Sequence, residues 1–147
     1  MVRDDRLPAL LESLKGRGER LTTARYALLA VLASATEHLT ADQLSTEVGR
    51  TNPAIHRATV YRTLETLRRL GIVEHTHLGH GPAVYHLVED IHQHLVCEVC
   101  GWMVEAPATL FRSVERKLQR DFGFEMRPNH FAVVGRCRRC SDQPELP

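Results

Sequence analysis

The sequence has 147 residues, of which 43% are hydrophobic and 25% charged, and its formal net charge at pH 7 is +1. This composition is ordinary for a soluble globular protein, and the length allows two small domains or one of medium size. No apolar run approaches the roughly 18 residues of a membrane-spanning helix, and the first residues lack a secretory signal pattern, so we expect a cytoplasmic protein.

The charge is unevenly distributed along the chain. Residues 1–73 contain 11 Lys and Arg against 8 Asp and Glu, whereas residues 74–147 contain 8 against 10. A modestly basic first half is compatible with nucleic-acid binding, because phosphates attract such a surface. A chance fluctuation would explain the difference equally well.

The sequence of the first half of the chain predicts a series of short helices. Apolar residues recur at helical spacing, and we expect helices over 7–15, 23–34, 41–50 and 57–70. Thr22 or Thr23 is the expected N-cap of the second helix, and Thr40 that of the third. In the second helix, Tyr26 and Leu29 are expected on the buried face.

The fourth predicted helix has two distinct sides. Val60, Leu64 and Leu67 recur at i, i+4 and i+7 and predict its buried side. The opposite side is polar, and the residues there that we expect to contact DNA are Arg57, Thr59, Tyr61 and Arg62. Arginine binds guanine edges or phosphates, and small residues allow a close approach in the major groove. For this helix taken alone, a solvated face is the alternative.

A β-hairpin is expected directly after this helix. Residues 72–77 alternate like a strand, residues 78–82 form a turn, and residues 83–87 form a second strand. Helices followed by a β-hairpin are typical of a winged helix-turn-helix, in which the last helix reads DNA. We therefore predict that residues 1–87 are a winged-helix DNA-binding domain.

Residues 88–91 have the character of a hinge, and residues 92–147 form a second predicted domain. Its expected elements are strands over 94–97, 101–105 and 130–135, with a helix that begins at Pro107 and ends at Gly123. Leu110, Val114 and Leu118 would give that helix one apolar face. The predicted fold class is α+β, with an N-terminal winged-helix domain and a C-terminal α/β domain.

Four cysteines occur as two CxxC pairs, at Cys97 and Cys100 and at Cys137 and Cys140. In a cytosolic chain this pattern favours metal binding over disulfides. A strand–helix–strand excursion could bring the two pairs together, and four thiolates make a closed tetrahedral site for structural Zn²⁺. Such a site leaves no open position for catalysis. The alternatives are buried free thiols or a redox-labile pair.

Six of the nine histidines lie between residues 74 and 100. His75 and His77 are two residues apart on a predicted strand, so their side chains point to one side and could share a metal ion. His92 and His94 have the same spacing. Imidazole suits nickel, zinc, copper and iron, and such clustering favours a transition-metal site over structural histidines.

These motifs resemble the ferric uptake regulator superfamily of metal-dependent repressors over nearly the whole chain. The matching segments are AlaThrValTyrArgThrLeu at 58–64, GlyIleVal at 71–73, the HisxHisLeuValCysxxCysGly run at 92–101, and GlyArgCysxxCys at 135–140. By this resemblance, Tyr61 and Arg62 contact bases and phosphates. The resemblance also implies a homodimer joined by residues 92–147 and a palindromic DNA operator, so the expected protein is a transcriptional repressor.

The resemblance implies two further metal sites. The regulatory site of the superfamily falls on His38, His86, His92 and His94, which would clamp the two domains together. A second set resembles the nickel-responsive branch and falls on His75, His77 and His130. We therefore expect a repressor that responds to nickel or another divalent transition metal.

The sequence also departs from the pattern of the superfamily. Another common sensory site would need histidines and an acid where this chain has Ile91, Gln93 and Arg112. The segment between Tyr85 and the next histidine pair is one residue shorter than in the nickel branch, which leaves the role of His86 open. Glu105 is either an additional oxygen ligand or a salt-bridged surface acid.

An iron-, zinc- or peroxide-responsive regulator of the same superfamily is the alternative function. The cysteine that the zinc-responsive branch places just after the wing is absent. An iron site usually includes a carboxylate, whereas the candidate ligands here are almost all histidines. A zinc hydrolase is not expected, because no HExxH motif occurs.

Overall fold

The computed structural model describes residues 6–88, 92–127 and 132–142. It divides the chain into two compact units, Met1–His75 with Ala83–Asp90 and Thr76–Pro82 with Ile91–Pro147. Apart from Val88, the predicted hinge over 88–91 lies outside the described residues. No helix in the described segments is long and apolar enough to cross a membrane.

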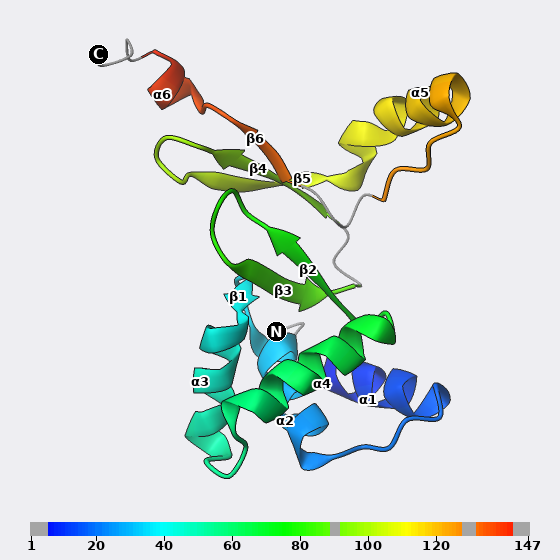
Figure 1. Cartoon of the computed structure of the whole chain (residues 1–147), viewed down its shortest axis with the longest axis vertical. Helices are drawn as coiled ribbons and strands as arrows, with labels where there is room; N and C mark the ends of the chain where they lie inside the picture. Colours follow the sequence, from blue (N-terminus) through cyan, green and yellow to red (C-terminus); the bar gives the residue numbers. More distant parts are fainter. Residues whose placement is uncertain (1–5, 89–91, 128–131, 143–147) are drawn as a thin grey trace. The chain divides into compact units, whose positions relative to one another are not determined.

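The first unit packs helices against a small sheet (Figure 1). Its helices are α1 (Arg6–Gly16), α2 (Thr23–Ser34), α3 (Ala41–Thr51) and α4 (Arg57–Arg69). Its sheet has the order β1-β3-β2, with strands β1 (Leu39–Thr40), β3 (Ala83–Leu87) and β2 (Val73–His77), of which Val73 to His75 belong to this unit. This is the predicted winged helix-turn-helix, with β2 and β3 as the wing. Strand β1 was not predicted, because two residues are too few to show an alternating pattern.

Side-chain caps fix the beginnings of α2 and α3. The Thr22 hydroxyl accepts a hydrogen bond from the Arg25 backbone N–H at 3.2 Å. Thr40 and Gln43 form a reciprocal capping box, in which the backbone N–H of Thr40 donates to the Gln43 side chain at 2.8 Å. Both predicted caps are confirmed, and each is worth about 1 kcal/mol of helix stability.

The core of the first unit holds α4 in place. The Val60, Leu64 and Leu67 side chains are at most 1% exposed, as predicted, and the opposite side of the helix faces solvent. In α2 the prediction for Tyr26 was wrong, because this side chain is 47% exposed while Leu28 is buried. Helix α2 is apolar nearly all round, so its periodicity does not indicate which face is buried.

The second unit is built around a mixed sheet with the order β5-β4-β6. Its elements are β4 (His92–Cys97), β5 (Met103–Pro107), the 3-10 turn η1 (Ala108–Phe111), α5 (Arg112–Phe122), β6 (Ala132–Gly135) and the short α6 (Arg138–Ser141). Strand β4 pairs antiparallel with β5 and parallel with β6. Pro107 ends β5 instead of opening the helix as predicted, since an edge strand tolerates a residue without an N–H.

Helix α5 has the predicted apolar face, but none of its side chains is buried within the described chain. Leu110 in η1 is 55% exposed, and Val114 and Phe122 in α5 are 45% and 75% exposed. Gly123 ends the helix as predicted, at a φ of 61° that favours glycine. A large apolar face left open by its own chain is typical of an interaction surface.

Candidate metal centres and nucleic-acid interface

The sheet of the second unit brings the two CxxC pairs together. Cys97 ends β4 and Cys137 precedes α6, and the parallel register places Cys97 opposite Gly135 of β6. All four cysteine sulfurs lie within 4.8 Å of one another, and the Sγ atoms of Cys100 and Cys137 are 3.8 Å apart. All four are free thiols. Four sulfurs converging in this way fit a tetrahedral divalent ion.

Backbone N–H groups and one arginine side chain donate hydrogen bonds to these sulfurs. Hydrogen bonds from backbone N–H groups, first that of Cys100 and then that of Cys137, lower the pKa of the Cys97 thiol to about 6. The N–H of Trp102 and then the Arg139 guanidinium lower the pKa of Cys100, whereas burial raises the pKa of Cys140 to about 12. Four thiolates around a dication carry a net charge of −2, and these donors offset part of it.

The local backbone of the first cysteine pair forms a tight turn. The Gly101 N–H donates to the Cys97 carbonyl at 3.0 Å, and Gly101 has a φ of 72°, which favours glycine. In the second pair, the Cys140 N–H donates to the Cys137 carbonyl at 3.0 Å. The backbone of each pair is therefore held by its own hydrogen bond, and the sulfurs of both pairs lie within 4.8 Å of one another.

The second unit also carries a pair of histidines on β4. The Nε2 atoms of His92 and His94 are 3.1 Å apart, and His94 is only 1% exposed. Glu105 lies across from His94 on β5, and its Oε1 is 3.5 Å from His92 Nε2. The candidate ligand atoms of all three lie within 4.8 Å of one another. Two ring nitrogens that face each other need a proton or a cation between them, so this cluster fits a metal ion.

The first unit carries a second pair of histidines. Leu39 of β1 pairs with Tyr85 of β3, so the antiparallel register places His38 opposite His86. Their ring centroids are 5.0 Å apart. Although the sequence left the role of His86 open, its ring stands beside that of His38.

The third predicted constellation is described only in part. His75 and His77 both lie on β2, where His75 is half-buried beside Tyr85, with 6.0 Å between their ring centroids, and His77 is exposed. His130 lies outside the described residues. The nickel-like set of His75, His77 and His130 therefore stays a prediction.

The predicted DNA-contacting residues lie on the outer side of α4. Arg57, Tyr61 and Arg62 are exposed, and Thr59 is half-buried. The Arg57 guanidinium lies over the Tyr61 ring, 5.4 Å from its centroid, and makes an ion pair of 2.6 Å with Asp42 of α3. This contact with α3 could not be foreseen from the pattern of α4 alone. The side presents two cationic groups and a phenol to solvent, which suits phosphates and base edges.

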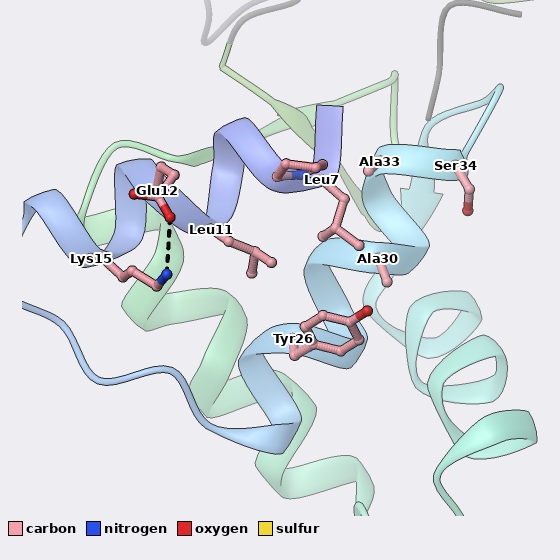
Figure 2. A pocket seen from close by; sticks show the side chains of 9 residues that line it. Leu7, Leu11, Glu12, Lys15, Tyr26, Ala30, Ala33 and Ser34 are labelled. Carbon is pink, nitrogen blue, oxygen red and sulfur yellow. Dashed lines mark hydrogen bonds and ion pairs between the residues drawn. The ribbon is translucent and has the colours of Figure 1, made fainter. Parts of the chain in front are cut away.

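A groove of about 410 Å³ lies between α1 and α2 (Figure 2). Its lining is largely apolar and includes Leu7, Leu11 and the exposed ring of Tyr26, with the Lys15–Glu12 ion pair of 2.9 Å at one side. No histidine or cysteine lines it. The groove is therefore not a candidate transition-metal site.

Comparison with known proteins agrees with this architecture. The model of the ferric uptake regulator family matches residues 16–133. The ferric uptake regulation protein of Bacillus subtilis (strain 168) is 34% identical over 143 residues, which cover 94% of this chain and 96% of that protein. The peroxide-responsive repressor PerR of Staphylococcus aureus (strain USA300) is 29% identical over 133 residues, 90% of each chain.

A solved structure of the ferric uptake regulator from Pseudomonas aeruginosa with manganese superposes with a TM-score of 0.71 at 25% identity. The match covers 94% of this chain and 99% of that one. The predicted fold class, a winged-helix unit followed by an α/β unit, is confirmed.

Proposed function

The chain belongs to the ferric uptake regulator family, and we propose that it is a metal-dependent DNA-binding transcriptional repressor. One observation carries the proposal. Each of the two units presents its own pair of adjacent imidazoles, His38 with His86 in the first and His92 with His94 in the second. The first unit also carries α4, with Arg57, Tyr61 and Arg62 exposed.

We propose that the two histidine pairs hold one regulatory ion. His92 and His94 would bind it from β4 with Glu105 as an oxygen ligand, and His38 and His86 would bind it from the winged-helix unit. When bound, the ion supplies a cross-link that limits the angles available to the two units. Shifting such an equilibrium from mostly open to mostly closed takes about 5.5 kcal/mol of differential binding. A site with several imidazoles can supply this much.

Nickel is the proposed effector. The support is the preponderance of imidazole nitrogen among the candidate ligands, which nickel accepts, and the resemblance of His75, His77 and His130 to the nickel-responsive branch. One observation favours an iron- or peroxide-responsive regulator instead. The Glu105 carboxylate lies 3.5 Å from His92, and iron sites usually include a carboxylate. The relatives named as a ferric uptake regulator and a peroxide-responsive repressor fit that second function.

Operator binding in different metals tests the proposal. A duplex selected from random sequence by the nickel-loaded protein would serve as the operator, and its Kd would be measured with Ni, Zn, Fe, Mn and EDTA. We expect metal to tighten binding by about 5- to 150-fold, the usual range of allosteric coupling, with the largest gain in nickel. Zinc content would be followed in parallel, so that loss of a structural ion is not mistaken for loss of the effector. Equal affinity in EDTA with the zinc retained would contradict the proposal.

We also propose that Cys97, Cys100, Cys137 and Cys140 hold structural Zn²⁺. The support is the convergence of their sulfurs and the amide and guanidinium donors around them. Four protein ligands complete a tetrahedral shell, so the ion would stabilise the fold and would have no open position for a substrate. The proposal accordingly assigns no catalytic residues to this chain.

A homodimer joined by the second unit is proposed as the DNA-binding form. The support is the open apolar face of η1 and α5, with Leu110, Val114 and Phe122, and the exposed Val133 and Val134 of β6. A second copy of the chain would cover these side chains around a two-fold axis. A palindromic operator would mirror that axis, with one α4 in each half-site.

Replacing Val114 by glutamate is expected to convert the dimer to a monomer in light scattering at micromolar concentration. Val114 is 45% exposed in the monomer, so the monomer tolerates the change, whereas a buried unpaired carboxylate opposes association. Gln119→Glu adds the same charge at another exposed position of α5 and is the matched control. A dimer of unchanged stability in Val114→Glu would place the subunit contact elsewhere.

A further inference from the structure

An acidic side chain of α3 contacts two of the α4 side chains that are proposed to contact DNA. Asp42 Oδ1 lies 2.6 Å from Arg57 Nη2 and accepts a hydrogen bond of 2.7 Å from the Tyr61 hydroxyl. Arg57 Nη2 also donates to the Tyr61 oxygen at 3.2 Å. The three groups thus form a closed triangle in which each touches the other two.

We propose that Asp42 is a positioning residue that sets the sequence specificity of the DNA-binding surface, by holding Arg57 and Tyr61 in one fixed arrangement. The proposal rests on the proposed function, because it assumes that α4 contacts DNA. It adds a residue of a different helix to the surface, one that the polar pattern of α4 does not include.

Both sides of the triangle are anchored to the core of the first unit. The capping box of Thr40 and Gln43 fixes the first turn of α3, where Asp42 also has a favourable position in the field of the helix. Val60 and Leu64 are at most 1% exposed and fix the corresponding turns of α4. The carboxylate therefore has a defined position relative to α4. Its contacts with the Arg57 guanidinium and the Tyr61 hydroxyl hold these two groups in place.

The contacts with Asp42 and Tyr61 limit the orientations in which the Arg57 guanidinium can bind DNA. A guanidinium has five N–H donors, and the two on Nη2 of Arg57 are directed at Asp42 and Tyr61, while Nη1 and Nε carry the other three on a side chain that is 66% exposed. The donors that remain on Nη1 and Nε are thereby held in one orientation, in which they can donate to an acceptor on a base edge. Without Asp42, Arg57 would turn freely to any phosphate, and phosphate contacts carry no sequence information.

The same carboxylate reduces binding to DNA of any sequence. Asp42 is 61% exposed beside a surface that would face phosphates, so it repels the backbone unless Arg57 stays paired with it. Exposed ion pairs contribute little to folding stability. Removing this carboxylate should therefore alter DNA selection while leaving the fold intact, which makes the inference testable by substitution.

The test compares Asp42→Asn with Glu47→Gln. Both remove one carboxylate from α3, and both break an exposed ion pair with an arginine, since Glu47 pairs with Arg50 of its own helix at 3.2 Å. Kd values of the metal-loaded proteins would be measured for the selected operator and for a random duplex over a range of KCl. Thermal unfolding of both variants should match that of the wild type.

We expect Asp42→Asn to lower the ratio of operator to random-duplex affinity about tenfold, the usual loss when a base-reading pair is released. Binding to the random duplex should tighten. The slope of the logarithm of its association constant against the logarithm of KCl concentration should become steeper by about one. Asp42→Glu keeps the charge and should recover most of the ratio, and Glu47→Gln should leave it within about twofold. These fold-changes reflect positioning, because a general loss of structure would weaken both duplexes together.

Two results would overturn the inference while leaving the proposed function in place. In the first, Asp42→Asn keeps the wild-type ratio although the wild type prefers its operator in a metal-dependent way. In the second, Asp42→Asn and Glu47→Gln change both duplexes equally, so only total charge matters. A wild type that prefers no duplex under any metal would instead overturn the proposed function, and this inference with it.

Discussion

Replacing Cys140 by serine is expected to abolish zinc binding at the proposed four-cysteine site and to unfold the second unit at room temperature. The Cys140 side chain is 7% exposed, and its sulfur belongs to the cluster of four. A serine hydroxyl is a poor zinc ligand, and structural zinc contributes about 10–16 kcal/mol in small zinc domains. Whole domains are stable by only about 5–15 kcal/mol, so losing even part of the zinc contribution is decisive. Zinc per chain by mass spectrometry and far-UV circular dichroism would measure the two effects.

The control for this substitution is Ser141→Ala, the next residue of α6, whose exposed hydroxyl donates a long hydrogen bond of 3.4 Å to the Arg136 carbonyl. It should bind one zinc per chain and unfold as the wild type does. The first unit should stay folded in Cys140→Ser, because its core is built from α1 to α4 and the wing. Retention of zinc and of wild-type thermal stability by Cys140→Ser would contradict a structural role for the cluster.

The fold was largely predictable where one local pattern decides the structure. The caps at Thr22 and Thr40 and the buried side of α4 follow from residue type and spacing, and they are confirmed. Prediction failed where tertiary packing decides. Leu29 is buried as predicted, but Tyr26 is exposed because it lies at the border of the buried face of α2, which also includes Leu28 and Leu32. Pro107 ends a strand because β5 lies at the edge of its sheet.

The candidate sites were predictable in residue type but less so in arrangement. The CxxC pairs indicate a thiolate site, yet only the parallel pairing of β4 with β6 brings together the sulfurs of Cys100 and Cys137, which are 37 positions apart in the sequence. Glu105 stands beside His92 because of the β4–β5 register, which no local pattern reveals. The contact of Asp42 with Arg57 likewise depends on how α3 packs against α4. Pairwise geometry between elements is the information that a single sequence lacks.

Replacing His92 or His38 by glutamine is expected to remove most of the metal-dependent gain in operator affinity. Each substitution deletes one imidazole of the proposed regulatory site, His92 from the second unit and His38 from the first. Coupling between sites in allosteric proteins is about 5- to 150-fold, and we expect each variant to lose most of it while keeping wild-type affinity in EDTA. His80→Gln, in the exposed turn between β2 and β3, is the control and should respond to metal normally.

Combining the two substitutions decides whether one ion is shared. If His38 and His92 bind the same ion, the first substitution already breaks the coupling, and the double variant should be no worse than either single variant. If they belong to separate sites, the two losses in binding free energy should add, as they do for independent residues. Metal titrations of the single variants sharpen the distinction, because a shared ion requires that His38→Gln weaken metal binding as much as His92→Gln does. A His38→Gln protein with wild-type metal affinity would leave His92, His94 and Glu105 as a site confined to the second unit.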